Sequence, residues 1–206
     1  MTKKERAKIV MTELEKIYPE VPIPLNHKNA YELLVAVALS AQTTDKKVNE
    51  VTPKLFSVAP NPQKMAILEE SEIKELIKEI GLSTTKAKNL KLMANQLLEK
   101  YNGEVPATFE DLENLAGVGH KTASVVMSQA FGFPAFPVDT HIHRLMKQWK
   151  LTEGKNVVQT ENDAKKLFPK ETWNKLHLQI IFYGREYSPA RGNQEKDYLT
   201  KMLFEK

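Results

Sequence analysis

The chain has 206 residues and no cysteine. Disulfide bonds, thiolate catalysis and metal sites built on cysteine are therefore excluded. Long apolar runs are missing too, since the longest, from Leu33 to Leu39, falls far short of the roughly 18–20 apolar residues that a membrane span needs. The N-terminal stretch MTKKERAKIV is basic and continues into an amphipathic pattern, without an apolar signal core. We therefore expect a soluble, cytoplasmic protein.

Neither sign of charge dominates the chain. The 30 Lys and Arg residues against 26 Asp and Glu residues give a net charge of +4. Such an excess permits nucleic-acid binding without establishing it. Hydrophobic residues make up 41% of the chain, which is typical of a folded globular protein. The length suits one large domain or two small ones.

The alternating pattern of β-strands is also missing, and apolar residues recur instead at helical spacing. The chain is therefore predicted to be all-α, with about ten helices. The predicted helices cover residues 3–18, 30–42, 45–58, 71–79, 85–101, 140–149 and 172–183, with others beginning after Thr108, Gly119 and Thr160. The helix over 30–42 is apolar nearly all round and is predicted to lie at the centre of the core. Pro60 and Pro62 break the helical pattern, and the tail, residues 185–206, is charged.

Gly117, Val118 and Gly119 join two predicted helices in a helix–hairpin–helix pattern. Glycine permits positive φ and close approach of a ligand to the backbone, and the N-terminus of the following helix favours an anion. A DNA phosphate fits such a site without any reading of the bases. A lone GVG is more often an ordinary turn, but the capped helix before it and the apolar helix after it favour phosphate binding.

Lys121 lies in the first turn of the helix after this hairpin. The positive end of the helix and partial burial both favour the neutral amine. A neutral amine can attack an electrophilic sugar carbon and form a Schiff base. The alternative is a lysine that binds phosphate beside the hairpin, and spacing alone leaves the two interpretations equal.

Asp139 directly precedes the helix that begins near Thr140 and is a favoured N-cap residue. A second interpretation gives its carboxylate a functional role, in which it stabilises positive charge developing on a DNA sugar and assists proton transfers. The two roles are compatible, because capping would fix the carboxylate in place. The other predicted caps are Asn29 with Glu32 as a capping box, Thr108 with Asp111, and Thr160 with Asp163.

The motif LAGVGHKTASVV, followed by VDTHIHR, resembles the endonuclease III family of helix–hairpin–helix DNA glycosylases. ELLVAVALSAQTTDKKVN, IKEIGLSTTKAKNL and NGEVPATFEDLENL match the family in order and spacing, so the resemblance covers nearly the whole chain. It implies a base-excision repair enzyme that removes oxidised pyrimidines and cleaves the strand at the resulting abasic site by β-elimination. The implied partner is double-stranded DNA with damaged bases or abasic sites, bound by a monomer at the bacterial nucleoid.

By the same resemblance Lys121 is the Schiff-base lysine and Asp139 the catalytic aspartate. The target nucleotide must be flipped out of the duplex. Gln42 would fill the vacated space and Leu82 would wedge into the base stack, although a polar residue at a helix end and an exposed loop leucine are the plainer interpretations. His141 lines the pocket, bonds the backbone or is merely structural. The remaining predicted DNA contacts are Gly117, Val118, Gly119, His120, Thr122 and, in the tail, Arg191, whose charge also suits a solvated surface.

The family fold has two all-α parts with the active site in the cleft between them. This predicts a six-helix domain over residues 22–133 and a second helical domain formed by residues 1–21 and 134–206. Most members hold a 4Fe–4S cluster with cysteines near the C-terminus. Cluster iron is normally held by thiolates, and Ser188 stands near the place of the first ligand. We therefore predict a variant without the cluster, with no cofactor and no metal.

Two departures from the family lie in the hairpin, where Ala116 replaces the usual proline and His120 the usual arginine. His120 either weakens the phosphate contact or changes substrate preference. Two other functions stay open. One is a monofunctional glycosylase for another damaged or mismatched base, against which Lys121 argues. The other is a catalytically inactive DNA-binding relative, against which the retention of both Lys121 and Asp139 argues.

Overall fold

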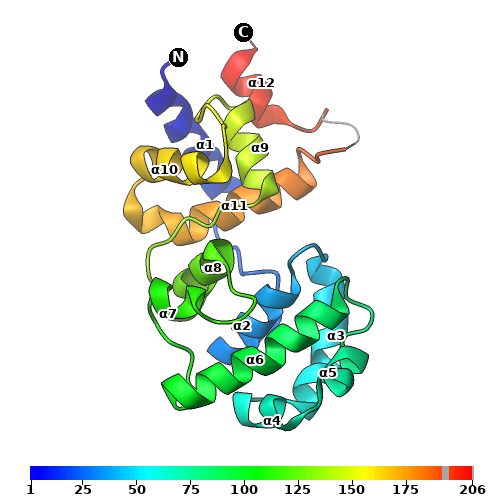
Figure 1. Ribbon diagram of the computed structural model, residues 1–206. Helices are drawn as coiled ribbons and strands as arrows, with labels where there is room; N and C mark the ends of the chain where they lie inside the picture. Colours follow the sequence, from blue (N-terminus) through cyan, green and yellow to red (C-terminus); the bar gives the residue numbers. More distant parts are fainter. Residues whose placement is uncertain (192–194, 206) are drawn as a thin grey trace. The chain divides into compact units, whose positions relative to one another are not determined.

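The computed structural model describes residues 1–191 and 195–205. These residues form twelve α-helices and one short 3₁₀ helix, with no strand among them, and the prediction of an all-α fold is confirmed. None of the described helices is long and apolar enough to cross a membrane. The chain divides into two compact units, residues 23–132 and residues 1–22 with 133–206, which are described separately (Figure 1). The predicted domains, residues 22–133 and residues 1–21 with 134–206, stay a prediction.

The unit of residues 23–132 is built around α2 (Ala30–Leu39). The other helices of this unit are α3 (Asp45–Val58), α4 (Pro62–Ile67), α5 (Glu70–Leu76), α6 (Ser83–Tyr101), α7 (Phe109–Glu113) and α8 (His120–Phe131). Packing of α3, α6 and α8 on α2 (Figure 1) leaves nearly all of its side chains buried. The predicted central core helix is therefore confirmed.

The long helix α6 contacts α2, α4 and α5. Its apolar side carries Leu90, Met93 and Leu97, which are almost completely buried. The chain leaves α6 through Asn102, in the left-handed conformation with φ 52°, as an Asn-Gly pair favours. Because α6 runs past α2 and up to the segment before α7, it can support several loops of this unit at once.

The other unit contains α1 (Lys3–Ile17), α9 (Thr140–Gln148), α10 (Val157–Leu167), the 3₁₀ helix (Lys170–Thr172), α11 (Trp173–Glu186) and α12 (Tyr198–Phe204). α11 packs against both α9 and α1, and α12 packs against α1. Trp149, Tyr183 and Phe136 are the largest fully buried side chains of its core. α1 covers this core with a single apolar stripe, as its sequence pattern predicts.

The structure has more helices than expected, because α4 and α12 were not predicted. α4 begins at Pro62, where proline was expected to interrupt the helical pattern. A proline at the first helical position loses no intrahelical bond, since that N–H has no partner in a helix, and Asn61 caps α4. α12 lies in the charged tail and is capped by Asp197, which accepts a hydrogen bond from the Thr200 N–H (3.1 Å).

The predicted start of α10 at Thr160 is wrong. α10 begins at Val157, and its cap is Asn156, which accepts from the Gln159 N–H (2.8 Å). Thr160 is completely buried inside the helix. Asn156, which was not predicted as a cap, takes this role, and Thr160 lies on the buried side of α10.

The two ends of α2 also differ from the prediction. Asn29 caps the helix and accepts from the Glu32 N–H (2.9 Å). The Glu32 carboxylate, however, accepts from the N–H of Lys28 (2.8 Å) instead of closing the predicted box on Asn29. At the other end α2 stops at Leu39 rather than near residue 42, so Gln42 lies in a loop.

Candidate nucleic-acid interface and catalytic residues

The two glycines of the hairpin between α7 and α8 have different roles. Gly117 has φ +76°, and a Cβ built on it would lie 3.1 Å from Cβ of Asn89 on α6. A side chain at this position would therefore be both strained and crowded. Gly119 has extended backbone, and a Cβ built on it would meet nothing within 4 Å. The first glycine shapes the turn, and the second leaves open space at the start of α8.

Gln96 of α6 forms two hydrogen bonds with the hairpin loop. Gln96 donates from Nε2 to the carbonyl of Asn114 (3.1 Å) and accepts from the N–H of Ala116 (2.8 Å). Val118 is buried, with 7% of the residue exposed, and belongs to the core of this unit. Its side chain therefore anchors the loop.

α8 begins with no side chain capping its first turn, because Gly119 is the N-cap. The N–H groups of a first turn have no intrahelical acceptor and favour an anion. Lys121 and Thr122 lie in this first turn, and Lys121 is exposed. The partial burial of Lys121 that the sequence argument assumed is thus not found, whereas its place beside the hairpin is.

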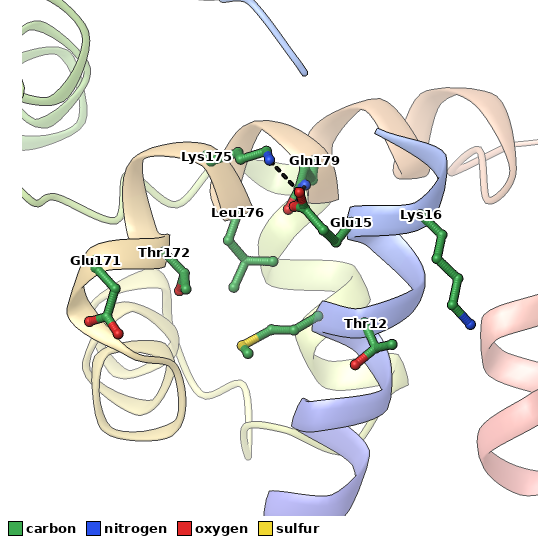
Figure 2. A pocket seen from close by; sticks show the side chains of 9 residues that line it. Thr12, Glu15, Lys16, Glu171, Thr172, Lys175, Leu176 and Gln179 are labelled. Atoms are coloured by element: carbon green, nitrogen blue, oxygen red, sulfur yellow. Dashed lines mark hydrogen bonds and ion pairs between the residues drawn. The ribbon is translucent and has the colours of Figure 1, made fainter. Parts of the chain in front are cut away.

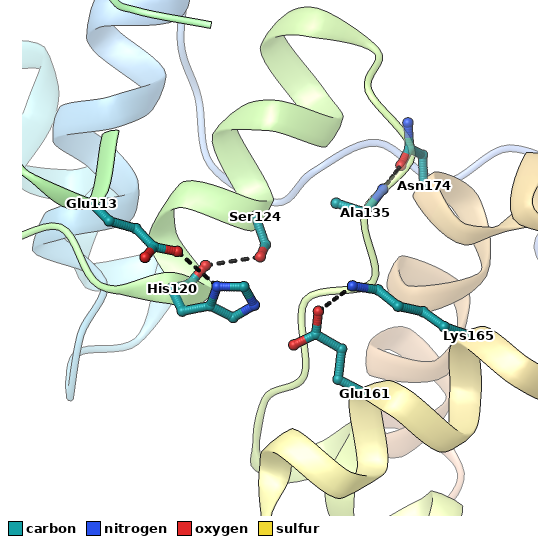
Figure 3. Close-up of polar contacts among 7 residues, drawn as sticks. All are labelled: Glu113, His120, Ser124, Ala135, Glu161, Lys165 and Asn174. Atoms are coloured by element: carbon teal, nitrogen blue, oxygen red, sulfur yellow. Dashed lines mark hydrogen bonds and ion pairs between the residues drawn. The ribbon is translucent and has the colours of Figure 1, made fainter. Parts of the chain in front are cut away.

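His120 is directed toward α7. Its Nδ1 lies 2.7 Å from Oε1 of Glu113, and its ring stacks on Phe109 with the centroids 5.8 Å apart. The carbonyl of His120 also accepts from the hydroxyl of Ser124 (2.8 Å), as Figure 3 shows. A carboxylate therefore stands next to His120, and it lowers the positive charge of this surface.

Gln42 and Leu82 are both exposed and both have left-handed backbone, with φ of 56° and 60°. Few residues other than glycine adopt this conformation, which is held only by surrounding structure. A Cβ built on Gly81 would lie 4.0 Å from the carbonyl oxygen of Gln42. The two loops are therefore adjacent, and each carries one of the two exposed side chains predicted to enter DNA.

Lys86 was missed by the sequence analysis. It is 8% exposed, and its Nζ reaches the loop that carries Gln42. A signal for it exists, because Lys86 stands four residues before Leu90 on the apolar side of α6. The neighbouring Lys88 is exposed, so the two lysines of this KAK sequence differ in burial.

Asp139 belongs to the other unit and is the N-cap of α9. Its Oδ1 accepts from the N–H of Ile142 at 2.8 Å, and its side chain is half-buried. Arg144 lies near this carboxylate. Burial lowers the pKa of Arg144, and the negative charges of Asp197 and Asp139 oppose that shift. Asp139 is thus confirmed as the N-cap of α9, and the capping hydrogen bond fixes the position of its carboxylate.

His141 packs into the space beside Gly184 of α11. A Cβ built on Gly184 would lie 3.1 Å from Nδ1 of His141 and 3.1 Å from Leu145. These contacts give His141 a packing role between α9 and α11. Arg191, in the tail, is exposed in a bend, so its predicted contact with phosphate stays a prediction.

A pocket of about 640 Å³ opens between α1 and α11 (Figure 2). The ion pair of Glu15 with Lys175 (2.6 Å) and the bond from Gln179 to Glu15 (2.9 Å) cross it. It shares no residue with the predicted site among the described residues. Residues 1–191 and 195–205 contain no group of three or more His, Cys, Asp or Glu side chains that could hold a metal.

Comparisons with known proteins identify the class of this fold and site. The sequence pattern of the HhH-GPD superfamily of base excision DNA repair proteins matches residues 35–170. Endonuclease III of Haemophilus influenzae is 44% identical over 191 residues, covering 93% of this chain and 90% of the relative. Endonuclease III of Synechocystis is 40% identical over 191 residues, covering 92% and 87%. A solved structure of a trapped endonuclease III–DNA covalent intermediate superposes with a TM-score of 0.91 at 40% identity, covering 94% of this chain and 92% of that one.

The chain belongs to the endonuclease III family of the HhH-GPD superfamily. It is a base-excision DNA repair enzyme, a DNA glycosylase that also acts as an abasic-site lyase. Membership of this family favours the bifunctional enzyme over a monofunctional glycosylase or an inactive relative.

The prediction that the protein has no cofactor is contradicted by this membership, because the family usually carries a 4Fe–4S cluster. Cluster iron is normally held by thiolates. The chain has no cysteine, and its described residues offer no metal site. The residues present therefore do not fit a thiolate-held cluster.

Proposed function

We propose that Lys121 is the nucleophile of this glycosylase and lyase and that Asp139 is the carboxylate that supports it. The observation that carries the proposal is the position of Lys121, exposed in the first turn of α8 directly after the open Gly119. A phosphate at this helix end would bring the neighbouring sugar within reach of the amine.

In the proposed reaction the neutral amine of Lys121 attacks C1′ of the flipped nucleotide. The bond from C1′ to the base breaks, and the base leaves with the electron pair and takes up a proton. Ring opening then breaks the C1′–O4′ bond, a proton passes from Nζ to O4′, and a Schiff base remains. Loss of a proton from C2′ expels the 3′ phosphate, and water hydrolyses the Schiff base. Asp139 stabilises positive charge at C1′ and carries protons in these steps.

The proposed substrate is double-stranded DNA that contains a damaged base or an abasic site, bound by one copy of the chain at the nucleoid in the cytoplasm. Backbone N–H groups of the hairpin and the first turn of α8, with Thr122 and Arg191, contact phosphates. Gln42 fills the space that the flipped nucleotide leaves, and Leu82 wedges into the stack. The support is the exposure of Gln42 and Leu82 on one surface.

Borohydride trapping tests this proposal. The protein is incubated with a duplex that contains one abasic site, and borohydride reduces any Schiff base to a stable adduct. We expect an adduct with the wild-type chain and with Lys88→Gln, an exposed lysine of the same unit, and none with Lys121→Gln. An adduct that persists in Lys121→Gln would assign the nucleophile elsewhere. Base release without any adduct, or binding without either activity, would overturn the lyase mechanism.

A further inference from the structure

Lys86 joins the two loops that carry Gln42 and Leu82. Its Nζ donates to the carbonyls of Leu39 (2.9 Å) and Ala41 (2.7 Å) and to the hydroxyl of Thr43 (3.1 Å). Its backbone N–H donates to the carbonyl of Leu82 (3.0 Å). The side chain of Lys86 thus bonds the segments on both sides of Gln42. Its backbone N–H makes the ordinary helical bond to Leu82, so the side chain ties the loop of Gln42 to the turn of α6 that directly follows Leu82.

A lysine is suited to this position for two reasons. An ammonium group has three N–H donors, and all three find oxygen acceptors here. α2 has no basic residue in its last turn, so the charge of Lys86 compensates the unpaired carbonyls at the negative end of that helix. Burial lowers the pKa of Lys86, and the three oxygen acceptors offset part of the cost of burying an ammonium group.

The conformations that Lys86 supports are strained. Gln42 and Leu82 have positive φ, and residues other than glycine keep this conformation only when their surroundings fix it. Short-range bonds in the loop are few, and the Thr43 N–H to Ser40 carbonyl bond (3.1 Å) is one of them. Without Lys86 the carbonyl of Ala41 and the hydroxyl of Thr43 lose the group that draws them toward α6.

We propose that Lys86 is a positioning residue that presets Gln42 and Leu82 as one rigid unit for simultaneous entry into the duplex. The proposal rests on the proposed roles of these two side chains in DNA. Presetting a loop removes the entropy cost of ordering it on binding. Lys86 therefore raises the preference for a duplex with a vacated base position over an undamaged duplex, and it leaves the chemistry at Lys121 untouched.

A double-mutant cycle tests this. Dissociation constants are measured by fluorescence anisotropy for a duplex with a tetrahydrofuran abasic analogue and for the matched undamaged duplex. We expect Lys86→Met to reduce the ratio of the two affinities by about tenfold, the scale of lost bonds to a charged donor. In a Gln42→Ala, Leu82→Ala background the same change should alter the ratio less than about twofold. Equal effects in both backgrounds would overturn the proposal.

Lys91→Met is the matched control, because Lys91 also lies on α6 and also donates its Nζ to a backbone carbonyl, that of Leu68 (2.6 Å). We expect it to leave the affinity ratio unchanged. A loss of the ratio in Lys91→Met equal to that in Lys86→Met would assign the effect to general weakening of α6 and overturn the proposal.

Two further readouts separate positioning from folding. Single-turnover strand cleavage at saturating abasic DNA should stay near the wild-type rate in Lys86→Met, while the DNA concentration at half-maximal rate rises. Amide exchange over residues 40–44 should accelerate in the free protein. Where Lys86→Met is unfolded at the assay temperature, Lys86→Gln, which keeps two of the three N–H donors but no charge, replaces it, and changes in the same direction but of smaller size are expected. Unchanged exchange over these residues in a folded variant would overturn the proposal.

Failure of the proposed function gives a different result. If the wild-type chain does not bind the abasic analogue more tightly than the undamaged duplex, the proposed roles of Gln42 and Leu82 are wrong, and so is the role of Lys86 that depends on them. If the wild-type chain prefers it and the cycle is additive, only the role of Lys86 falls.

Discussion

The imidazole of His120 and the carboxylate of Glu113 meet across the hairpin, with Nδ1 and Oε1 2.7 Å apart. Stacking on Phe109 holds the same ring against α7. The carboxylate stands beside the turn for which we propose a phosphate contact, so its charge opposes the approach of DNA. If His120 stands in place of an arginine, as the sequence predicts, the change affects the local balance of charge through Glu113.

Substituting Glu113→Gln should strengthen binding of undamaged duplex DNA. Removal of one negative charge beside a phosphate contact is expected to raise affinity by about two- to fivefold at low salt. The gain should shrink as added salt screens the charge. Stability should change by less than about 1 kcal/mol, because the pair is largely exposed. Fluorescence anisotropy over a salt series measures the first effect, and urea unfolding measures the second.

Glu99→Gln is the matched control for this prediction. Glu99 is an exposed carboxylate on α6, so its substitution makes the same change in net charge. An equal gain in both variants would mean that only the overall charge matters and that Glu113 has no special relation to the site.

The two hairpin glycines should respond differently to alanine. Gly117→Ala is expected to destabilise the fold by about 1–3 kcal/mol, because its positive φ is costly for a residue with a Cβ and Asn89 crowds the added methyl. Gly119→Ala should cost less, about 0.5–1 kcal/mol for the poorer N-cap, since its backbone is extended and the space is open. It should instead weaken DNA binding, because the methyl occupies the space through which a phosphate approaches. Urea unfolding measures the stability of both variants, and fluorescence anisotropy measures their DNA binding. A larger stability loss in Gly119→Ala, with a binding loss confined to Gly117→Ala, would contradict the roles given to both glycines.

Local features of the site could be predicted from the sequence. The hairpin turn depends on glycine spacing, and the cap of α9 depends on Asp139 and the residues directly after it. Thr108 likewise caps α7, with the Asp111 N–H donating to its hydroxyl at 3.1 Å. In each case the residues that interact are within a few positions of one another, so their spacing carries the information.

Features that join distant segments could not be predicted in this way. Lys86 bonds residues more than forty positions earlier in the chain, and nothing in its immediate sequence specifies that partner. Asp197 is buried among side chains from α9 and α11, including Gln148 and Tyr183. The short apolar pattern after it, with Leu199 and Leu203 buried, stands within a tail that was taken as charged, which is why α12 was missed. Packing between segments, rather than local propensity, decides such positions.

Tyr183→Phe should destabilise the unit that contains α12. The hydroxyl of Tyr183 donates to Oδ1 of Asp197 (2.7 Å) and accepts from the N–H of Leu199 (3.0 Å). All three groups are buried, so loss of the hydroxyl leaves a carboxylate oxygen and an N–H without this partner, at a cost of about 1–3 kcal/mol. Tyr187→Phe, on the ring stacked against Tyr183 (5.2 Å), is the control and should cost less than about 0.5 kcal/mol. Equal losses in urea unfolding would show that the bonds of Tyr183 contribute nothing specific.

Asp111 should make the stability of the unit of residues 23–132 sensitive to acid. Its carboxylate accepts hydrogen bonds from the hydroxyls of Thr108 (2.7 Å) and Tyr101 (2.9 Å), and these bonds hold the pKa of Asp111 below its ordinary value of 3.8. The folded chain therefore binds this proton less readily than the unfolded chain does. The stabilisation is fully present above pH 3.8 and is lost as the pH falls through the lower, folded-state pKa.

Asp111→Asn removes this titration, so the stability of the variant should fall less steeply than that of the wild-type chain below pH 3.8. Glu104→Gln, an exposed carboxylate in the same segment, should leave the acid dependence of the wild-type chain in place. Urea unfolding at a series of pH values measures both curves. Superimposable acid limbs for Asp111→Asn and the wild-type chain would show that the Thr108 and Tyr101 bonds do not favour the ionised carboxylate, because a group with equal pKa in both states contributes no pH dependence to folding.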